Sequence, residues 1–79
     1  MNFYTRILSV INEVLGEKKI QISQLDEDLI SLDIDSITFI SIVIALEQNF
    51  NFEFDDEMLL IANFPTLRVL TEYVKTKTF

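Results

Sequence analysis

The sequence predicts an all-α fold, a bundle of three main helices with one further short helix. The chain of 79 residues holds one glycine and one proline, which leaves little material for the tight turns of a hairpin-rich sheet. Apolar residues make up 49% of the chain, and in three stretches they recur at helical spacing. A chain of this length has room for one hydrophobic core, so we expect residues 1–79 to form a single domain.

The first helix is predicted from about Phe3 to Leu15. Asn2 is a favourable N-cap, and Gly16 is a favourable residue for ending the helix. Between them, one apolar stripe follows the helical period and is expected to face the core; it consists of Phe3, Ile7, Val10, Ile11 and Val14.

Residues 17–35 are predicted to form a long connection, with a short helical turn near Ser23 to Leu29. A connection of this length is often functional in a compact domain. Its isolated apolar residues are expected to anchor it across the helices; they are Ile20, Ile22, Leu25, Leu29, Leu32 and Ile34.

The second helix is predicted to begin at Asp35 or Ser36 and to end near Asn49 or Phe50. It carries two apolar stripes, which is more than one core-facing side requires. We assign the first stripe to the core: Phe39, Ile42, Val43, Leu46 and Phe50. The second begins beside Ser36 and is Ile37, Ile40 and Ile44. The second stripe is either buried as well or a docking surface, and the sequence leaves both interpretations open.

The remaining chain predicts a short third helix and a longer last one. Asp55 or Asp56 can cap the short helix, which is expected to run through about Ile61. Thr66 is a suitable N-cap for a last helix to about Lys75, whose positive charge suits the C-terminal end of the helix dipole. The residues of that helix expected to face inward are Leu67, Leu70 and Val74.

The composition excludes most kinds of catalytic site. The chain has no His, Cys or Trp, so it lacks Ser–His and Cys–His dyads and zinc sites built from Cys and His. The acidic run at residues 55–57 lacks the ligand spacing and central Gly of an EF-hand loop, so we expect no dedicated metal site. No apolar run has the length of a membrane span, and no secretory signal is evident. The expected location is the cytoplasm.

The negative charge is concentrated in the middle of the chain. The net charge is −7, and the span from Ile20 to Leu67 holds ten acids with no Lys or Arg. Nucleic acid is therefore an unsuitable partner, because binding it requires a basic surface. A basic protein surface is a suitable partner, since opposite potentials steer association.

The triplet Asp35-Ser36-Ile37, at the head of a predicted helix after a long loop, resembles the phosphopantetheine attachment motif of acyl and peptidyl carrier proteins. The resemblance continues through an ordered series of segments and covers nearly the whole chain. The matching segments are Ala45-Leu46-Glu47, Phe50, Phe52-Glu53-Phe54, Asp55-Asp56-Glu57, Phe64-Pro65-Thr66-Leu67 and Tyr73-Val74.

This resemblance implies a four-helix acyl-carrier-like bundle, monomeric and without catalytic activity of its own. It implies that 4'-phosphopantetheine is attached covalently to Ser36 and that Asp35 orients the motif. The expected partners are a phosphopantetheinyl transferase, an acyl- or aminoacyl-loading enzyme, and downstream synthase or transferase enzymes. The second stripe, Ile37, Ile40 and Ile44, would then be the centre of a docking face, with an acidic rim of Glu47, Glu53, Asp55, Asp56 and Glu57.

The chain departs from the common carrier pattern at several positions. Asp33 stands where many fatty-acid carriers have Gly, and Asn51 replaces the usual Gly after Phe50. Thr38, Ser41 and Gln48 are neutral, whereas fatty-acid carriers usually have acids in this helix, so we expect a specialised nonribosomal-peptide or polyketide pathway. The alternatives are a fatty-acid carrier, an unmodified acidic helical interaction module, and a small Ca²⁺-responsive protein. For Ser36 itself, the alternative role is a plain helix N-cap.

Overall fold

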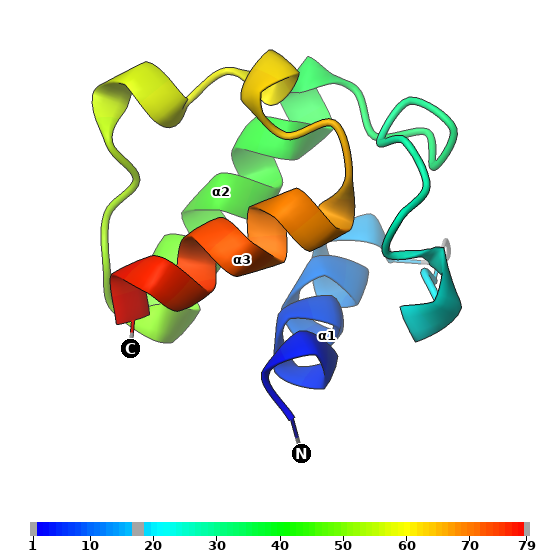
Figure 1. The fold of residues 1–79 in the computed structure, drawn as a ribbon, viewed down its shortest axis with the longest axis horizontal. Coiled ribbons are helices and arrows are strands. Elements are labelled where there is room, and N and C mark those ends of the chain that lie inside the picture. The colour runs from blue at the N-terminus through cyan, green and yellow to red at the C-terminus, as the bar shows by residue number, and fades with distance from the viewer. Residues whose placement is uncertain (1, 17–18, 79) are drawn as a thin grey trace.

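The computed structural model describes residues 2–16 and 19–78 (Figure 1). Three α-helices make up most of this part of the chain: α1 (Phe3–Leu15), α2 (Ser36–Phe50) and α3 (Leu67–Thr78). Three short 3₁₀ turns lie in the connections: η1 (Ile22–Gln24), η2 (Asp56–Met58) and η3 (Ile61–Asn63). The described residues contain no β-strand, only an isolated bridge between Asp28 and Thr66, so the all-α prediction is confirmed.

Helix α1 has the predicted bounds and both predicted ends. The Asn2 side chain accepts a hydrogen bond from the Thr5 backbone N–H at 2.8 Å, which satisfies one of the free donors of the first turn. Gly16 ends the helix with φ 71°, a backbone conformation that costs glycine little because it has no Cβ.

The core lies where the three helices meet, and α1 packs against both α2 and α3. The connection preceding α2 contributes several of its buried side chains, as predicted, but Ile22 is a correction because it is 50% exposed. Its turn η1 is also shorter than the helical turn expected near Ser23 to Leu29. The largest fully buried side chains are Ile7, Ile11, Ile34, Phe39, Ile42, Leu46, Phe64, Leu67, Leu70, Thr71 and Val74.

The long connection is fastened to the start of α3. The Arg68 backbone N–H donates to the Leu25 carbonyl at 2.9 Å. The Arg68 guanidinium forms a bidentate ion pair with the Asp26 carboxylate, with a shortest N–O distance of 2.7 Å. The Leu29 N–H donates to the Pro65 carbonyl at 3.1 Å. These bonds hold the loop in place although it contains little regular structure.

The predicted short third helix is present only as the two 3₁₀ turns η2 and η3. Leu60 is extended between them, with φ −110° and ψ 129°, so the helical path is interrupted. The buried Phe54 and Phe64 fix both ends of this segment in the core. A short stretch with fixed ends gains too few hydrogen bonds to propagate an α-helix.

Helix α3 runs further than predicted, to Thr78 rather than about Lys75. Its N-terminus is capped as expected, because the Thr66 hydroxyl accepts the Val69 N–H at 3.3 Å. Leu67, Leu70 and Val74 are completely buried. Within residues 2–16 and 19–78, no helix has the length and apolar character needed to cross a bilayer.

Candidate functional site

Ser36 is the first residue of α2, and its side chain is exposed. The preceding residue provides the cap: an oxygen of the Asp35 carboxylate accepts the Thr38 backbone N–H at 2.8 Å. The sequence allowed either Asp35 or Ser36 in this role, and the structure assigns it to Asp35. The Ser36 hydroxyl therefore lies at the surface of the helix N-terminus without being required as its cap.

The electrostatics of this helix start favour negative charge. The hydrogen bond from the Thr38 backbone N–H, with further bonds around the first turn, holds the pKa of the Asp35 carboxyl below its ordinary value. The first N–H groups of α2 and the helix dipole present partial positive charge here. A phosphodiester on Ser36 would be stabilised by the same charge distribution.

A tight turn before α2 positions Ser36. The Asp33 N–H donates to the Ile30 carbonyl at 3.0 Å, and the Ile34 N–H donates to the Leu29 carbonyl at 3.0 Å. Asp33 has φ 60°, a left-handed conformation that favours Gly. Asp is among the few other residues that adopt it at modest cost. Ile34, 1% exposed, then anchors the turn in the core.

The other serines of the chain lie in settings that differ from that of Ser36. Ser9 and Ser41 lie within helices, and Ser41 donates a hydrogen bond to a backbone carbonyl of its own helix. Ser23 and Ser31 lie in the long connection. Ser36 alone among them combines an exposed side chain with a helix N-terminus.

The two apolar stripes of α2 differ sharply in exposure. In the first stripe, Phe39, Ile42, Val43 and Leu46 are each at most 2% exposed. In the second stripe, Ile37 is 79% exposed, Ile40 42% and Ile44 49%. The interpretation that the second stripe is buried is therefore wrong. These three isoleucines form an apolar surface that starts beside Ser36 and continues along α2.

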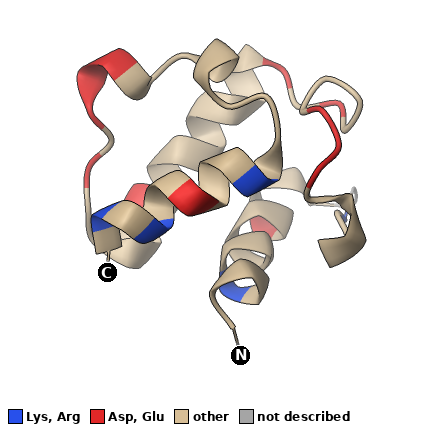
Figure 2. Cartoon of the chain, viewed as in Figure 1, with Lys and Arg blue, Asp and Glu red and all other residues tan. Residues whose placement is uncertain are grey.

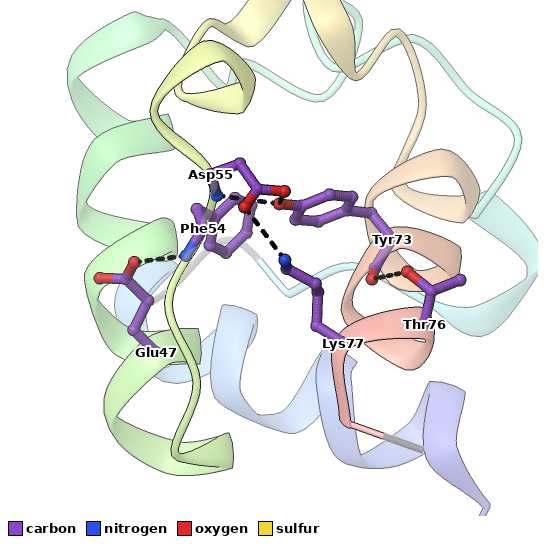
Figure 3. A network of polar contacts seen from close by, with 6 residues as sticks. All are labelled: Glu47, Phe54, Asp55, Tyr73, Thr76 and Lys77. Atoms are coloured by element: carbon purple, nitrogen blue, oxygen red, sulfur yellow. Dashed lines mark hydrogen bonds and ion pairs between the residues drawn. The ribbon is translucent and has the colours of Figure 1, made fainter.

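Two acids of the expected docking rim are engaged within the chain (Figure 3). A carboxylate oxygen of Glu47 accepts the Phe54 N–H at 2.8 Å. The Asp55 carboxylate accepts from the Tyr73 hydroxyl at 3.0 Å and from Lys77 Nζ at 3.1 Å. Lys77, and next the Tyr73 hydroxyl, lower the pKa of the Asp55 carboxyl, and Asp55 raises the pKa of Lys77. The Asp55 side chain thus bridges to α3 instead of capping η2.

The other rim acids, Glu53, Asp56 and Glu57, are exposed. Figure 2 shows acidic segments in the long connection and around η2, whereas the basic residues it colours lie mainly on α1 and α3. No three acids among the described residues form a cluster suited to a metal ion. Two acids of the span are paired with basic residues of α3, Asp26 with Arg68 and Asp55 with Lys77.

A groove of about 320 Å³ was not anticipated from the sequence. Its lining is largely apolar and comes from the long connection and from the segment around η3: Asp28, Leu29, Ile30, Ile61, Ala62, Phe64 and Pro65. A smaller hollow of about 290 Å³ adjoins the turn before α2 and is lined by Ile30, Asp33, Ile34 and Asp35. The sequence signal that could have indicated this groove is the adjacent apolar pair Leu29-Ile30. Only one of these two side chains can face the core, so the other is left at the surface.

Comparison with known protein families shows which family the chain belongs to. The family described as "phosphopantetheine attachment site" matches residues 5–74, which is most of the chain. The chain belongs to this family. Comparison with curated proteins and with solved structures gave no match.

Members of the phosphopantetheine attachment site family carry 4'-phosphopantetheine covalently on a serine, and this is the cofactor of the chain. The residues present fit the group, since an exposed serine stands at a helix N-terminus whose free N–H groups and dipole favour a phosphate. The chain is a phosphopantetheine-bearing carrier of all-α fold. Carrier domains of this family are generally non-catalytic, and they interact with phosphopantetheinyl transferases and partner enzymes.

Proposed function

We propose that Ser36 is the attachment residue and that the chain carries acyl, aminoacyl or peptidyl groups without being an enzyme itself. The single observation behind this proposal is the exposed Ser36 at the start of α2, within a matched attachment-site family and with Asp35 already serving as the cap. The prosthetic group supplies the thiol on which cargo is held as a thioester. The chain has no Cys and therefore no thiol of its own.

The modification itself is a balanced group transfer. The Ser36 Oγ forms a P–O bond to the phosphate of phosphopantetheine as the pyrophosphate bond of coenzyme A breaks. Adenosine 3',5'-bisphosphate leaves, and the hydroxyl proton passes to a base of the transferase. The exposed position of Ser36 gives an external enzyme access to the hydroxyl.

The outer side of α2 is proposed as the docking face for enzymes that act on the cargo. Ile37, Ile40 and Ile44 supply its apolar centre, and central apolar contacts usually dominate binding energy. The exposed Glu53, Asp56 and Glu57 supply an acidic rim that would steer basic partners. Glu47 and Asp55 also belong to the rim, and their hydrogen bonds to Phe54 and α3 hold these carboxylates in fixed positions.

The pathway we propose is a specialised one, of the nonribosomal-peptide or polyketide kind. Glu47 is the only charged residue of α2. Thr38, Ser41 and Gln48, which replace acids typical of fatty-acid carriers, thus leave most of this helix neutral. Loading by an aminoacyl-adenylating enzyme would indicate a nonribosomal-peptide pathway. Loading by a malonyl transferase would indicate a polyketide or fatty-acid pathway. Acceptance of malonyl groups alone, together with function in fatty-acid extension, would contradict this part of the proposal.

The attachment residue is tested by intact-mass measurement after incubation with coenzyme A and a broad-specificity phosphopantetheinyl transferase. The parent chain should gain one phosphopantetheine, and Ser36→Ala should gain none. Ser31→Ala is the matched control, because this serine is also exposed and lies five residues earlier in the chain. Modification that persists in Ser36→Ala would show that attachment occurs elsewhere. A parent chain that is never modified would instead favour an acidic interaction module.

A further inference from the structure

A second exposed apolar surface lies in the chain that precedes Ser36. We call it the Ile30 face and define it by Ile30, Ile61, Ala62 and Pro65, which line one groove. Ile30 is 84% exposed, more than any isoleucine of α2. The same side chain also lines the hollow formed with Asp33 and Asp35, so the face reaches the residue next to Ser36.

The walls of the Ile30 face are anchored in the fold. Leu29 is 3% exposed and Phe64 is completely buried, so the side chains that flank the groove belong to the core. The Leu29 N–H bonds to the Pro65 carbonyl at 3.1 Å, which ties the two walls together. Ile30 therefore projects from a turn that is held by hydrogen bonds. Because its side chain is mostly exposed, it contributes little to the stability of the isolated chain.

The charges around this face indicate the kind of protein surface that fits it. Asp28 lines the groove and Asp33 lines the adjoining hollow, beside the Asp35 cap. The sequence contains no Lys or Arg between Ile20 and Leu67, which includes both walls. A complementary surface thus carries an apolar side chain with basic residues around it.

Any enzyme that modifies Ser36 must cover the surface around it. A standard protein interface buries roughly 800 Å² on each partner. This is about a sixth of the 4885 Å² accessible surface of the chain. A patch of that area centred on Ser36 would extend about 16 Å from it, and the hollow beside Ile30 begins at the neighbouring Asp35.

We propose that the Ile30 face is a contact surface for the phosphopantetheinyl transferase. Ile30 packs among apolar side chains of that enzyme, and Lys or Arg residues of the enzyme lie over Asp28 and Asp33. This inference rests on the proposed modification of Ser36, and it adds the surface by which the modifying enzyme recognises the chain.

The test measures kcat/KM for phosphopantetheine transfer from coenzyme A by a broad-specificity transferase. Ile30→Ala should lower kcat/KM by about 5- to 30-fold, the effect of removing a central apolar contact. Ile30→Lys should lower it further, because it adds positive charge opposite a basic surface. The matched control is Ile22→Ala, a half-exposed isoleucine in η1 of the same connection, which should be modified like the parent.

A second measurement separates docking from chemistry. Ser36→Ala cannot be modified, so it should act as a competitive inhibitor of the transferase, and adding Ile30→Ala should raise its inhibition constant by a similar factor. Thermal unfolding of Ile30→Ala should match that of the parent. Equal kcat/KM for Ile30→Ala and Ile22→Ala, with the parent modified normally, would overturn this inference and leave the proposed function intact. Failure of the parent to be modified would remove both.

Other occupants of the groove give different results. Self-association of the parent that Ile30→Ala abolishes, measured by light scattering, would assign the face to a second copy of this chain. NMR shifts at Ile30 and Ala62 on attachment of the arm, with an unchanged transfer rate in Ile30→Ala, would assign it to the arm. Either result would overturn the proposed contact with the transferase.

Discussion

Ile42 and Ile44 are two isoleucines of α2 with opposite exposure, and truncating each to alanine tests the division between core and docking face. Ile42 is 1% exposed, whereas Ile44 is 49% exposed. Both substitutions remove the same atoms from the middle of the same helix. Differences in helix propensity therefore cancel, and what remains is the difference in burial.

The expected magnitudes follow from the buried area. Removing the side-chain carbons beyond Cβ of a buried isoleucine loses about 2.4 kcal/mol of transfer free energy at about 0.8 kcal/mol per carbon. The cavity left at Ile42 brings the cost of Ile42→Ala to about 2–5 kcal/mol. At Ile44 roughly half of the transfer term applies, and the better helix propensity of alanine offsets about 0.4 kcal/mol of it. Ile44→Ala should therefore cost about 1 kcal/mol or less.

Urea denaturation followed by circular dichroism measures both free energies of unfolding, with unchanged m-values as the check on two-state behaviour. A loading assay on the phosphopantetheinylated chain then measures docking. Ile44→Ala should weaken productive binding of the loading enzyme by about 1–3 kcal/mol, as for a central apolar contact. Glu53→Lys, at an exposed rim position, should mainly slow association and change its salt dependence.

Comparable destabilisation by Ile44→Ala and Ile42→Ala would refute this division. Ile44 would then belong to the core, and any loss of loading would follow from unfolding. Normal stability together with normal loading by every cognate enzyme would instead refute the docking role while leaving the fold as described.

Three further predictions concern Asp35, Asp33 and Thr71. The lowered pKa of Asp35 means that its charged cap stabilises the fold above about pH 4 and that this contribution is lost as the pH falls through the folded-state pKa; the stability gap between the parent and Asp35→Asn should therefore shrink as the pH falls below about 4. Asp33 has φ 60°, so Asp33→Gly should be about 1 kcal/mol more stable than Asp33→Ala, and equal stability would contradict the assigned turn. The Thr71 hydroxyl is buried without a hydrogen-bond partner among the described residues, so Thr71→Val should raise the free energy of unfolding by about 1 kcal/mol; a loss of stability would reveal a partner.

The helix starts could be predicted from the sequence because they depend on residues close together in the chain. Asn2 caps α1 through a bond to a residue three positions later, and Asp35 caps α2 in the same way. The period of the apolar residues identified the buried stripe of α2 for the same local reason. The position of Ser36 as the first residue of α2, directly after the Asp35 cap, follows from these local rules.

Tertiary packing decided what local rules left open. Asp55 was one of two residues expected to cap the short third helix, but Lys77 and the Tyr73 hydroxyl, more than fifteen residues away, bind its carboxylate instead. A carboxylate with several possible hydrogen-bond partners binds those that the fold brings within reach. The sequence does not show which of these partners will be near.

Exposure in the long connection was also decided by packing. Ile22 and Ile30 have the same side chain, and only Ile22 was among the residues predicted to anchor the connection. The structure leaves both exposed and buries Leu25, Leu29 and Ile34. An irregular loop has no period that relates sequence position to a buried side, so the face that each residue presents is set by the bonds that fasten the loop to α3 and by the volume left in the core.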